Sequence, residues 1–230
     1  MKELSGFARL SAAASLALAG LFSTAAEAQG FGVFNSCAQP SAYAGKLIKR
    51  VLDMTRQHFQ PPLPTVYVCR NAWVPNAMAF TRQVGPNQWR HAMHYNPAFM
   101  AQLDAARQNE WAQLAVIAHE IGHLVQAHEA IQLGSYAPPQ TLAALNYPWG
   151  RELYADRHAG FVMATLGAKP EDLAEAQLFM FSPHGSPSHP DTVSRLNAIY
   201  NGYTLGGGNA AGLPDPASLA TDIMTRMTRW

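Results

Sequence analysis

The expected fold of this chain depends on the stretch Ala118-His119-Glu120-Ile121-Gly122-His123. If the stretch is helical, His119 and His123 lie one turn apart on the same face, with Glu120 beside them. Two imidazoles with this spacing can reach one metal ion, and the pattern HEXXH is typical of zinc hydrolases. The stretch therefore predicts a metal site on a helix.

The residues around this stretch have the pattern of a helix that packs on one side. The segment Trp111–Glu129 contains no proline, and its apolar residues recur at helical spacing. These residues are Leu114, Ala118, Ile121 and Val125. At about 100° per residue, the two histidines project from roughly the opposite face, so another element has to close the site. Structural core histidines would instead lie among the aliphatic residues, and this separation favours metal binding.

A second predicted helix, Arg151–Leu166, can complete the metal site. Catalytic zinc usually has three protein ligands and keeps a fourth position for water. Glu152 and Asp156 are four residues apart and therefore share one face of this helix. We expect Glu152 to be the third ligand and Asp156 to accept a hydrogen bond from a ligand imidazole. The alternative is an exposed acidic pair near a helix N-terminus, where carboxylates are favoured.

The segments before the metal helix indicate a helix followed by a small sheet. The apolar pattern predicts a helix from Pro40 to Phe59. Strands are predicted at Thr65–Cys69, Ala77–Thr81 and Trp89–Tyr95. We therefore expect an α+β fold that is mostly helical, with a small antiparallel sheet ahead of the metal helix.

The other histidines give no second metal pattern. His91 and His94 are three apart on a predicted strand and point to opposite faces, so they cannot chelate one ion, and a surface or supporting position is expected. Surface or hydrogen-bonded positions are also expected for His58, His128, His158 and His184.

A further motif, Ser188-His189-Pro190, precedes a predicted helix that carries Arg195. Taken alone, His-Pro can be only a turn before a helix. Together with HEXXH and the acidic helix, it resembles the gluzincin zinc metallopeptidases of the CAAX-prenyl-protease and HtpX type, family forty-eight of the metallopeptidases. The upstream Asn76-Ala77-Met78-Ala79-Phe80 is similar to the strand before the zinc helix in that family. The resemblance covers roughly residues 65–200.

This resemblance implies a zincin-like domain with zinc-dependent endopeptidase activity. His119, His123 and Glu152 would bind zinc (Zn2+), and Glu120 would be the catalytic base. The substrate would be a polypeptide, and unfolded or misfolded exported proteins are expected. Many relatives have membrane helices, which are not predicted in the mature chain, so prenylated membrane substrates are not expected.

Three further residues are implied to support this site. Asp156 would support the metal ligands, and His189 and Arg195 would lie near the catalytic cleft. Relatives usually carry an acidic residue before this arginine, where this chain has Ser194. His189, or a tyrosine such as Tyr154, could donate a hydrogen bond to the oxyanion of the reaction. Two alternatives remain: a metal-binding chaperone or scaffold with a latent zinc site capped by His189, and a zinc hydrolase of non-peptide bonds.

The N-terminus has the pattern of a signal peptide. Lys2 and Arg9 lie before or at the start of an apolar run over Leu10–Phe22, and Ala26-Glu27-Ala28 supplies a small-x-small cleavage pattern. We expect cleavage after Ala28 and a periplasmic or secreted protein. The alternative is an uncleaved membrane anchor, but the run is shorter than the roughly 20 residues that a span needs.

Length and composition favour one domain. The 230 residues are 48% hydrophobic, which is enough for one sizeable core. The net charge of +1 and the 13% of charged residues indicate neither a nucleic-acid partner nor an anionic membrane surface, and the oligomeric state stays open. We expect a signal peptide at 1–28, the metallopeptidase domain at 29–202 and a Gly/Pro-rich tail at 203–230. The tail ends in a short predicted helix, which is expected to pack on the domain; the alternative is a contact with a partner or a membrane.

Two cysteines lie in the expected mature chain, Cys37 and Cys69. In an oxidising compartment an even count favours a disulfide. It would close a loop of about thirty residues and stabilise the fold by roughly 3 to 4 kcal/mol. Two buried thiols or thiolate ligands are the alternatives, although neither cysteine belongs to a CxxC pair.

Overall fold

The computed structural model describes residues 38–107, 110–136, 148–177 and 189–227. The predicted signal peptide, Cys37 and His184 lie outside these ranges. In the described part of the chain, no helix combines the length and apolar character that crossing a bilayer requires. The disulfide stays a prediction, although Ala38 forms an antiparallel bridge with Arg70, which places the chain neighbours of both cysteines together.

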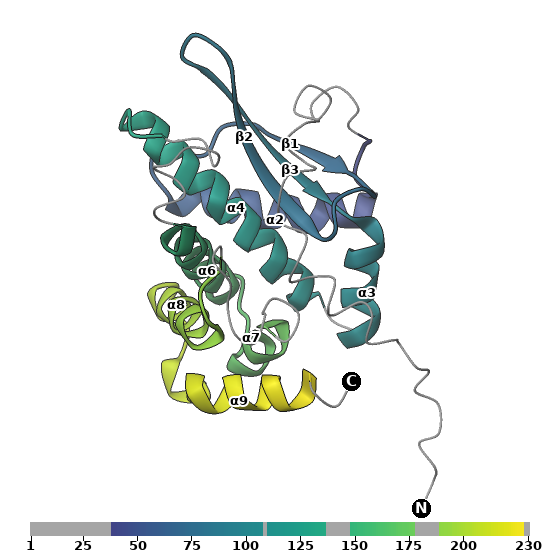
Figure 1. Ribbon diagram of the computed structural model, residues 1–230, viewed down its shortest axis with the longest axis vertical. Coiled ribbons are helices and arrows are strands. Elements are labelled where there is room, and N and C mark those ends of the chain that lie inside the picture. Colours follow the sequence, from purple (N-terminus) through teal and green to yellow (C-terminus); the bar gives the residue numbers. More distant parts are fainter. Residues whose placement is uncertain (1–37, 108–109, 137–147, 178–188, 228–230) are drawn as a thin grey trace, which may run out of the picture.

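Helices dominate the fold, and three strands form one small sheet (Figure 1). The helices of the described residues are α2 (Ala42–His58), α3 (Pro97–Arg107), α4 (Trp111–Gln132), α6 (Pro148–Thr165), α7 (Pro170–Gln177), α8 (Thr192–Leu205) and α9 (Pro216–Met227). A short 3-10 helix, η1, covers Ala210–Gly212. The strands are β1 (Val66–Arg70), β2 (Ala77–Gly85) and β3 (Gln88–Tyr95). The mostly helical α+β class predicted from the sequence is confirmed.

The sheet is mixed, with β3 between β1 and β2. β2 and β3 form an antiparallel hairpin, and Asn87 takes a φ of 55° at its turn, a conformation that asparagine tolerates. β1 pairs with β3 in parallel, so the expectation of a wholly antiparallel sheet is wrong for this strand. The reason is that the chain reverses direction twice between β1 and β3, and β3 then inserts between the first two strands. β2 is left as an edge strand.

α4 is the central helix of the fold, with the sheet on one side and helices on the other (Figure 1). It packs against β2 and α6, and also against α2 and α7. Its side chains are therefore buried around most of its circumference, including Ile117 and Leu124, which lie outside the predicted apolar stripe. The apolar stripe predicted from the sequence therefore covers only part of the buried surface of this helix, because α4 has neighbours on most sides.

α6 packs closely between α4 and α8. Gly122 of α4 faces Ala155 of α6, and a Cβ atom at Gly122 would lie 2.9 Å from the Ala155 Cα atom. On the other side of α6, a Cβ atom at Gly160 would lie 2.0 Å from the carbonyl oxygen of Ile199 in α8. Only glycine permits backbones to approach this closely. These contacts bring together the three helices that carry the candidate site.

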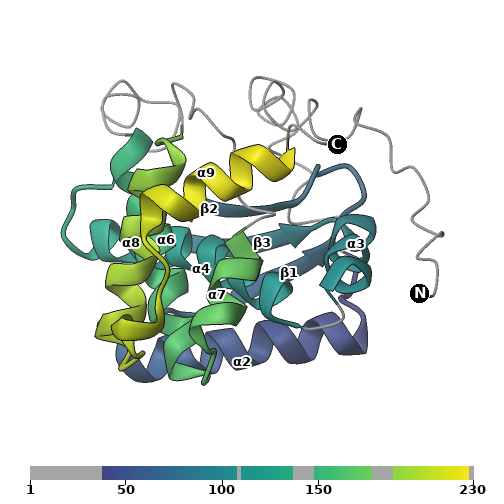
Figure 2. The same ribbon diagram turned by 90° about the horizontal axis from the view of Figure 1, so that it is seen from below.

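The C-terminal helix α9 packs on the rest of the protein, and α2 lies on the opposite side of the molecule (Figure 2). Ala220 and Ile223 of α9 belong to the buried core. The tail helix therefore docks on the domain, as one of the two sequence interpretations expected, and it begins at Pro216.

Candidate metal centre

Three side chains from α4 and α6 converge in a group that can hold a metal ion. His119 and His123 come from α4 and Glu152 from α6, and their potential ligand atoms all lie within 4.8 Å of one another. The Nε2 atoms of His119 and His123 are 3.1 Å apart. One Glu152 carboxylate oxygen lies 3.4 Å from His119 Nε2, and the other lies 3.4 Å from His123 Nε2.

These distances match the spacing of ligands around a tetrahedral metal ion. Metal-ligand bonds of about 2.0–2.2 Å at tetrahedral angles place neighbouring ligand atoms about 3.3–3.6 Å apart. The three separations in this cluster, 3.1, 3.4 and 3.4 Å, are close to that range. Two imidazole nitrogens and a carboxylate oxygen also form a donor set that suits zinc and similar divalent ions. The residues therefore fit a divalent cation.

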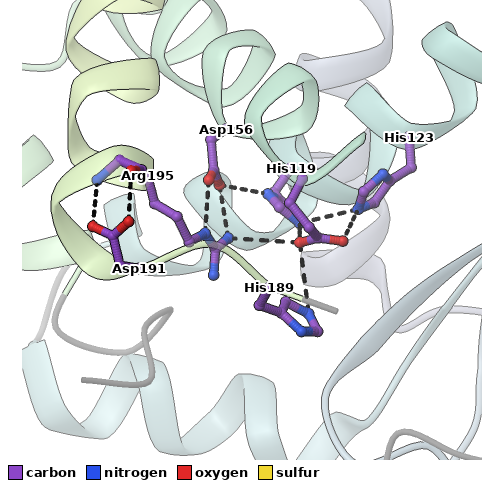
Figure 3. Close-up of polar contacts among 8 residues, drawn as sticks. His119, His123, Asp156, His189, Asp191 and Arg195 are labelled. Atoms are coloured by element: carbon purple, nitrogen blue, oxygen red, sulfur yellow. Dashed lines mark hydrogen bonds and ion pairs between the residues drawn. The ribbon is translucent and has the colours of Figure 1, made fainter. Parts of the chain in front are cut away.

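Asp156 connects one ligand to a buried arginine (Figure 3). Its Oδ1 atom lies 2.9 Å from His119 Nδ1, and Arg195 donates two hydrogen bonds of 2.7 Å to the same carboxylate. Because an ionised carboxylate can only accept, His119 carries its proton on Nδ1 and leaves Nε2 as the ligand atom. Arg195 also lies 3.9 Å from a Glu152 oxygen. The arginine thus compensates the buried negative charge and fixes Asp156.

The charges of the cluster favour a cation. Burial opposes ionisation of Asp156, but Arg195 and the hydrogen bond from His119 hold the pKa of that carboxyl below its usual value. Burial likewise opposes ionisation of Glu152, and the two ligand histidines lower its pKa. Burial lowers the pKa of His119, yet Asp156 and Glu152 raise it to about 10. Burial and the charge of His119 lower the pKa of His123 to about 3. A bound metal would therefore displace a proton from His119.

Glu120 connects the cluster to the sheet. It directly follows the ligand His119, and its carboxylate accepts a hydrogen bond from the Ala79 N–H of β2. Burial raises the pKa of Glu120 to about 7, with the charge of His119 opposing the shift and that of Glu152 adding to it. A carboxyl group with a pKa near neutrality can both accept and return a proton.

The edge of β2 passes the carboxylate of Glu120. The outward N–H of Ala79 meets Glu120, and the outward C=O of Thr81 accepts a hydrogen bond of 3.3 Å from the Tyr136 hydroxyl. Within the described residues, no further strand pairs with this edge. Beside the metal cluster, the outward backbone groups of β2 are therefore contacted by side chains rather than by another described strand.

His189 lies beside the cluster without belonging to it (Figure 3). Its Nε2 atom is 3.6 Å from a Glu152 oxygen, but the described ligand group contains only His119, His123 and Glu152. The segment that carries His189 leads directly into α8, whose N-terminus is capped by the Asp191 side chain accepting from the Ser194 N–H at 2.9 Å. His189 and Arg195 are therefore both brought to Glu152 by the start of α8.

The two strand histidines are buried, so a surface position is wrong for them. His91 Nδ1 lies 2.9 Å from the Thr81 hydroxyl, and His94 Nδ1 lies 3.1 Å from the Asn71 amide nitrogen. The surface interpretation failed because both faces of β3 are covered near its end. Both histidines support the sheet from which the β2 edge is built.

A buried histidine joins three helices behind the cluster, and sequence reasoning missed this link. His158 Nδ1 donates to the Ala118 carbonyl oxygen at 2.8 Å, and Nε2 accepts from the Thr55 hydroxyl at 3.1 Å. The expectation of a hydrogen-bonded position is thus confirmed for His158, but its partners lie far away in the sequence. The hydroxyl of Tyr154, considered above as an oxyanion donor, donates instead to Glu129 at 2.8 Å.

Comparisons of the chain with protein-family models, with curated proteins and with solved structures gave no match. The chemistry of the centre is therefore inferred from the residues themselves. Two imidazoles and a carboxylate can bind a divalent cation, and the carboxyl group of Glu120 beside them can transfer protons.

Proposed function

We propose that the protein is a zinc-dependent endopeptidase that hydrolyses peptide bonds in unfolded or misfolded exported proteins. The proposal is carried by Glu120, which lies next to a metal ligand and is hydrogen-bonded to the edge of β2. The resemblance of the motifs to gluzincin peptidases supports the same class. His119, His123 and Glu152 would hold the ion. When bound, zinc supplies Lewis acidity, which acidifies a coordinated water and polarises a carbonyl group.

Glu120, Asp156 and Arg195 would have separate roles in proton transfer and in the positioning of His119. Glu120 takes a proton from the attacking water and passes it to the leaving amine, which requires a pKa near the working pH. Asp156 keeps His119 in the tautomer that presents Nε2, and Arg195 keeps Asp156 in place.

The β2 edge accounts for the proposed substrate class. A polypeptide that pairs with this edge is recognised mainly through its backbone rather than its side chains. Backbone groups of a folded protein are already hydrogen-bonded within its own secondary structure. An extended, unfolded segment is therefore the form of polypeptide that such an edge accepts.

His189 supports a second candidate function, a metal-binding chaperone or scaffold with a latent site. Its Nε2 atom lies 3.6 Å from a Glu152 oxygen, a separation close to that between ligands of one ion. A small movement of this segment would add His189 as a fourth protein ligand and close the site. The presence of Glu120 favours the peptidase, because a closed site has no use for a proton-transferring carboxylate.

Proteolysis of reduced, carboxymethylated casein tests the proposed function. The zinc-loaded chain beginning at Gln29 is compared with Glu120→Gln, and zinc content is measured for both. We expect Glu120→Gln to bind zinc and to lose about 10²- to 10⁴-fold in rate. Glu129→Gln, on the same helix but bonded to Tyr154, is the matched control and should keep its activity.

An inactive parent protein would not by itself refute the peptidase, because His189 could block the metal centre. If parent and Glu120→Gln both bind zinc and neither cuts casein, His189→Ala is added to open a capped centre. Continued inactivity of this opened protein would refute the peptidase and move the binding function ahead. X-ray absorption at the zinc edge distinguishes the two candidates independently, because His189 would add a third imidazole to the ligands of the ion.

A further inference from the structure

A tyrosine side chain closes the edge of β2 two residues beyond Ala79. The Tyr136 hydroxyl donates to the Thr81 carbonyl oxygen at 3.3 Å. The Tyr136 ring packs edge-to-face on Trp89, with 4.9 Å between ring centroids and an interplanar angle of 76°. The side chain is therefore held at both its ring and its hydroxyl. Because Tyr136 follows α4 in the chain, this contact comes from outside the sheet.

The hairpin register determines which backbone groups of β2 face outward. Side chains and backbone groups alternate along a strand, so Ala77, Ala79 and Thr81 direct their N–H and C=O groups to the same side. The hydrogen bonds of Ala79 to Glu120 and of Thr81 to Tyr136 identify this side as the outer edge. A peptide antiparallel to β2 would donate its N–H groups in turn to the carbonyls of these three residues.

We propose that Tyr136 limits the length of substrate that pairs with β2. An antiparallel peptide runs its N-terminal part from Ala79 towards Thr81, where the carbonyl that its next N–H requires is already bonded. The tyrosine hydroxyl takes the place of the next N–H of a peptide strand, which would lie about 4.8 Å from β2. Backbone pairing on the N-terminal side of the scissile bond therefore ends at the residue opposite Ala79. This inference rests on the proposed function.

The consequence is a specificity for short extended segments. Substrate residues beyond the one opposite Ala79 gain no backbone hydrogen bond from β2, so lengthening a peptide at its N-terminus adds no affinity. A polypeptide needs only a short exposed stretch to be accepted, as in a locally unfolded loop. Tyr136 is in this sense a specificity-determining residue, although it lies outside the group of metal ligands and Glu120.

Peptide hydroxamates provide the test. A C-terminal hydroxamate binds zinc, so the preceding residues lie along β2 in a fixed register. Dissociation constants are measured while the peptide is lengthened one residue at a time at its N-terminus. The zinc-loaded parent is compared with Tyr136→Phe, which frees the Thr81 carbonyl, and with Tyr136→Ala, which also removes the ring. Tyr154→Phe is the matched control, because it also removes one tyrosine hydroxyl, here bonded to Glu129.

We expect the affinity of the parent and of Tyr154→Phe to stop rising at the residue opposite Ala79. In Tyr136→Ala, the peptide residue opposite Thr81 should increase the affinity about two- to tenfold, the value of one hydrogen bond. The same gain is expected in Tyr136→Phe if the remaining ring leaves room for the peptide. Replacing that residue's amide by an ester, which removes the N–H, should abolish the gain.

Three results would overturn the inference: affinity that keeps rising in the parent, no gain in either Tyr136 variant, or a gain that survives the ester. Zinc-loaded parent that binds no hydroxamate would also overturn it. The casein assay distinguishes the proposed peptidase activity from the proposed role of Tyr136. Hydroxamate binding with the expected pattern, but without casein cleavage, would refute only the peptidase activity. Failure to bind zinc would refute both.

Discussion

Gly122 of α4 lies against Ala155 of α6, and a single methyl group there should damage the candidate metal centre. In Gly122→Ala, the new Cβ atom would lie 2.9 Å from the Ala155 Cα atom and 3.0 Å from the His158 Cβ atom. Carbon atoms in contact need about 3.5–4.0 Å, so α6 has to move away by roughly 0.6–1 Å. Metal ligation tolerates only about 0.2 Å, and this shift would carry Glu152 out of reach of an ion held by α4.

We expect Gly122→Ala to weaken zinc binding about ten- to hundredfold, as measured by competition with a chromophoric chelator. Overpacking costs about 1–3 kcal/mol, and the gain in helix propensity offsets about 1 kcal/mol of it. The free energy of unfolding in urea should therefore fall by up to about 2 kcal/mol.

Gly45→Ala in α2 is the matched control, because the nearest atom to its new Cβ would be a Pro40 carbon at 3.9 Å. It should raise the free energy of unfolding by about 0.5–1 kcal/mol and leave zinc affinity unchanged. If Gly122→Ala behaves like this control, with parental zinc affinity and increased stability, then close packing of α4 and α6 does not set the ligand geometry.

Three further predictions concern charge. The lysine of Arg195→Lys cannot make the paired hydrogen bonds to Asp156, so the zinc affinity of this variant should fall about ten- to hundredfold. Arg157→Lys, on the exposed face of α6, should leave the affinity unchanged. Equal zinc affinities of the two variants would contradict the positioning role of Arg195. Zinc uptake at pH 8 should release about one proton, because the pKa of His119 is about 10 before the metal binds, and calorimetry in buffers of different ionisation enthalpy measures this number. Zero release would show that His119 is already neutral. Burial lowers the pKa of His158 from 6.5 to about 4. As the pH falls, His158 is therefore protonated in the unfolded chain before it is protonated in the folded protein. The free energy of unfolding decreases as the pH falls from 6.5 towards 4. Between pH 7 and pH 5 this loss is about 2 kcal/mol in urea unfolding, and His158→Asn should remove it; an unchanged pH dependence in the variant would assign the loss to other groups.

The residues of the candidate ligand set could be predicted from the sequence because helical spacing places each pair on one face of its helix. His119 and His123 share one helix face, as do Glu152 and Asp156, and the structure brings all four together. The mostly helical α+β class followed from the same local periodicity. The place of Arg195 near the site was predicted only from resemblance. Its pairing with Asp156 was not predicted, since 39 residues separate the two and no spacing rule connects them.

The features that sequence reasoning missed all depend on contacts between distant segments. The parallel pairing of β1 with β3 is decided by which strand inserts in the middle of the sheet. The bond from Tyr136 to Thr81 spans 55 residues, and that from His158 to Thr55 spans 103. Gly122 was part of the quoted motif, but its close approach to Ala155 could not be read from the motif, because the register of two helices is set by packing over their whole length.

The distribution of the centre over α4, α6 and α8 has a consequence for a newly made chain. His119, Glu152 and Arg195 are far apart in sequence and meet only when all three helices have docked. A chain that is still folding therefore carries the parts of the centre separately and lacks the arrangement that would cut a peptide bond. As a peptidase, such a protein would become active only on completing its own folding, and it would be harmless to itself and its neighbours until then.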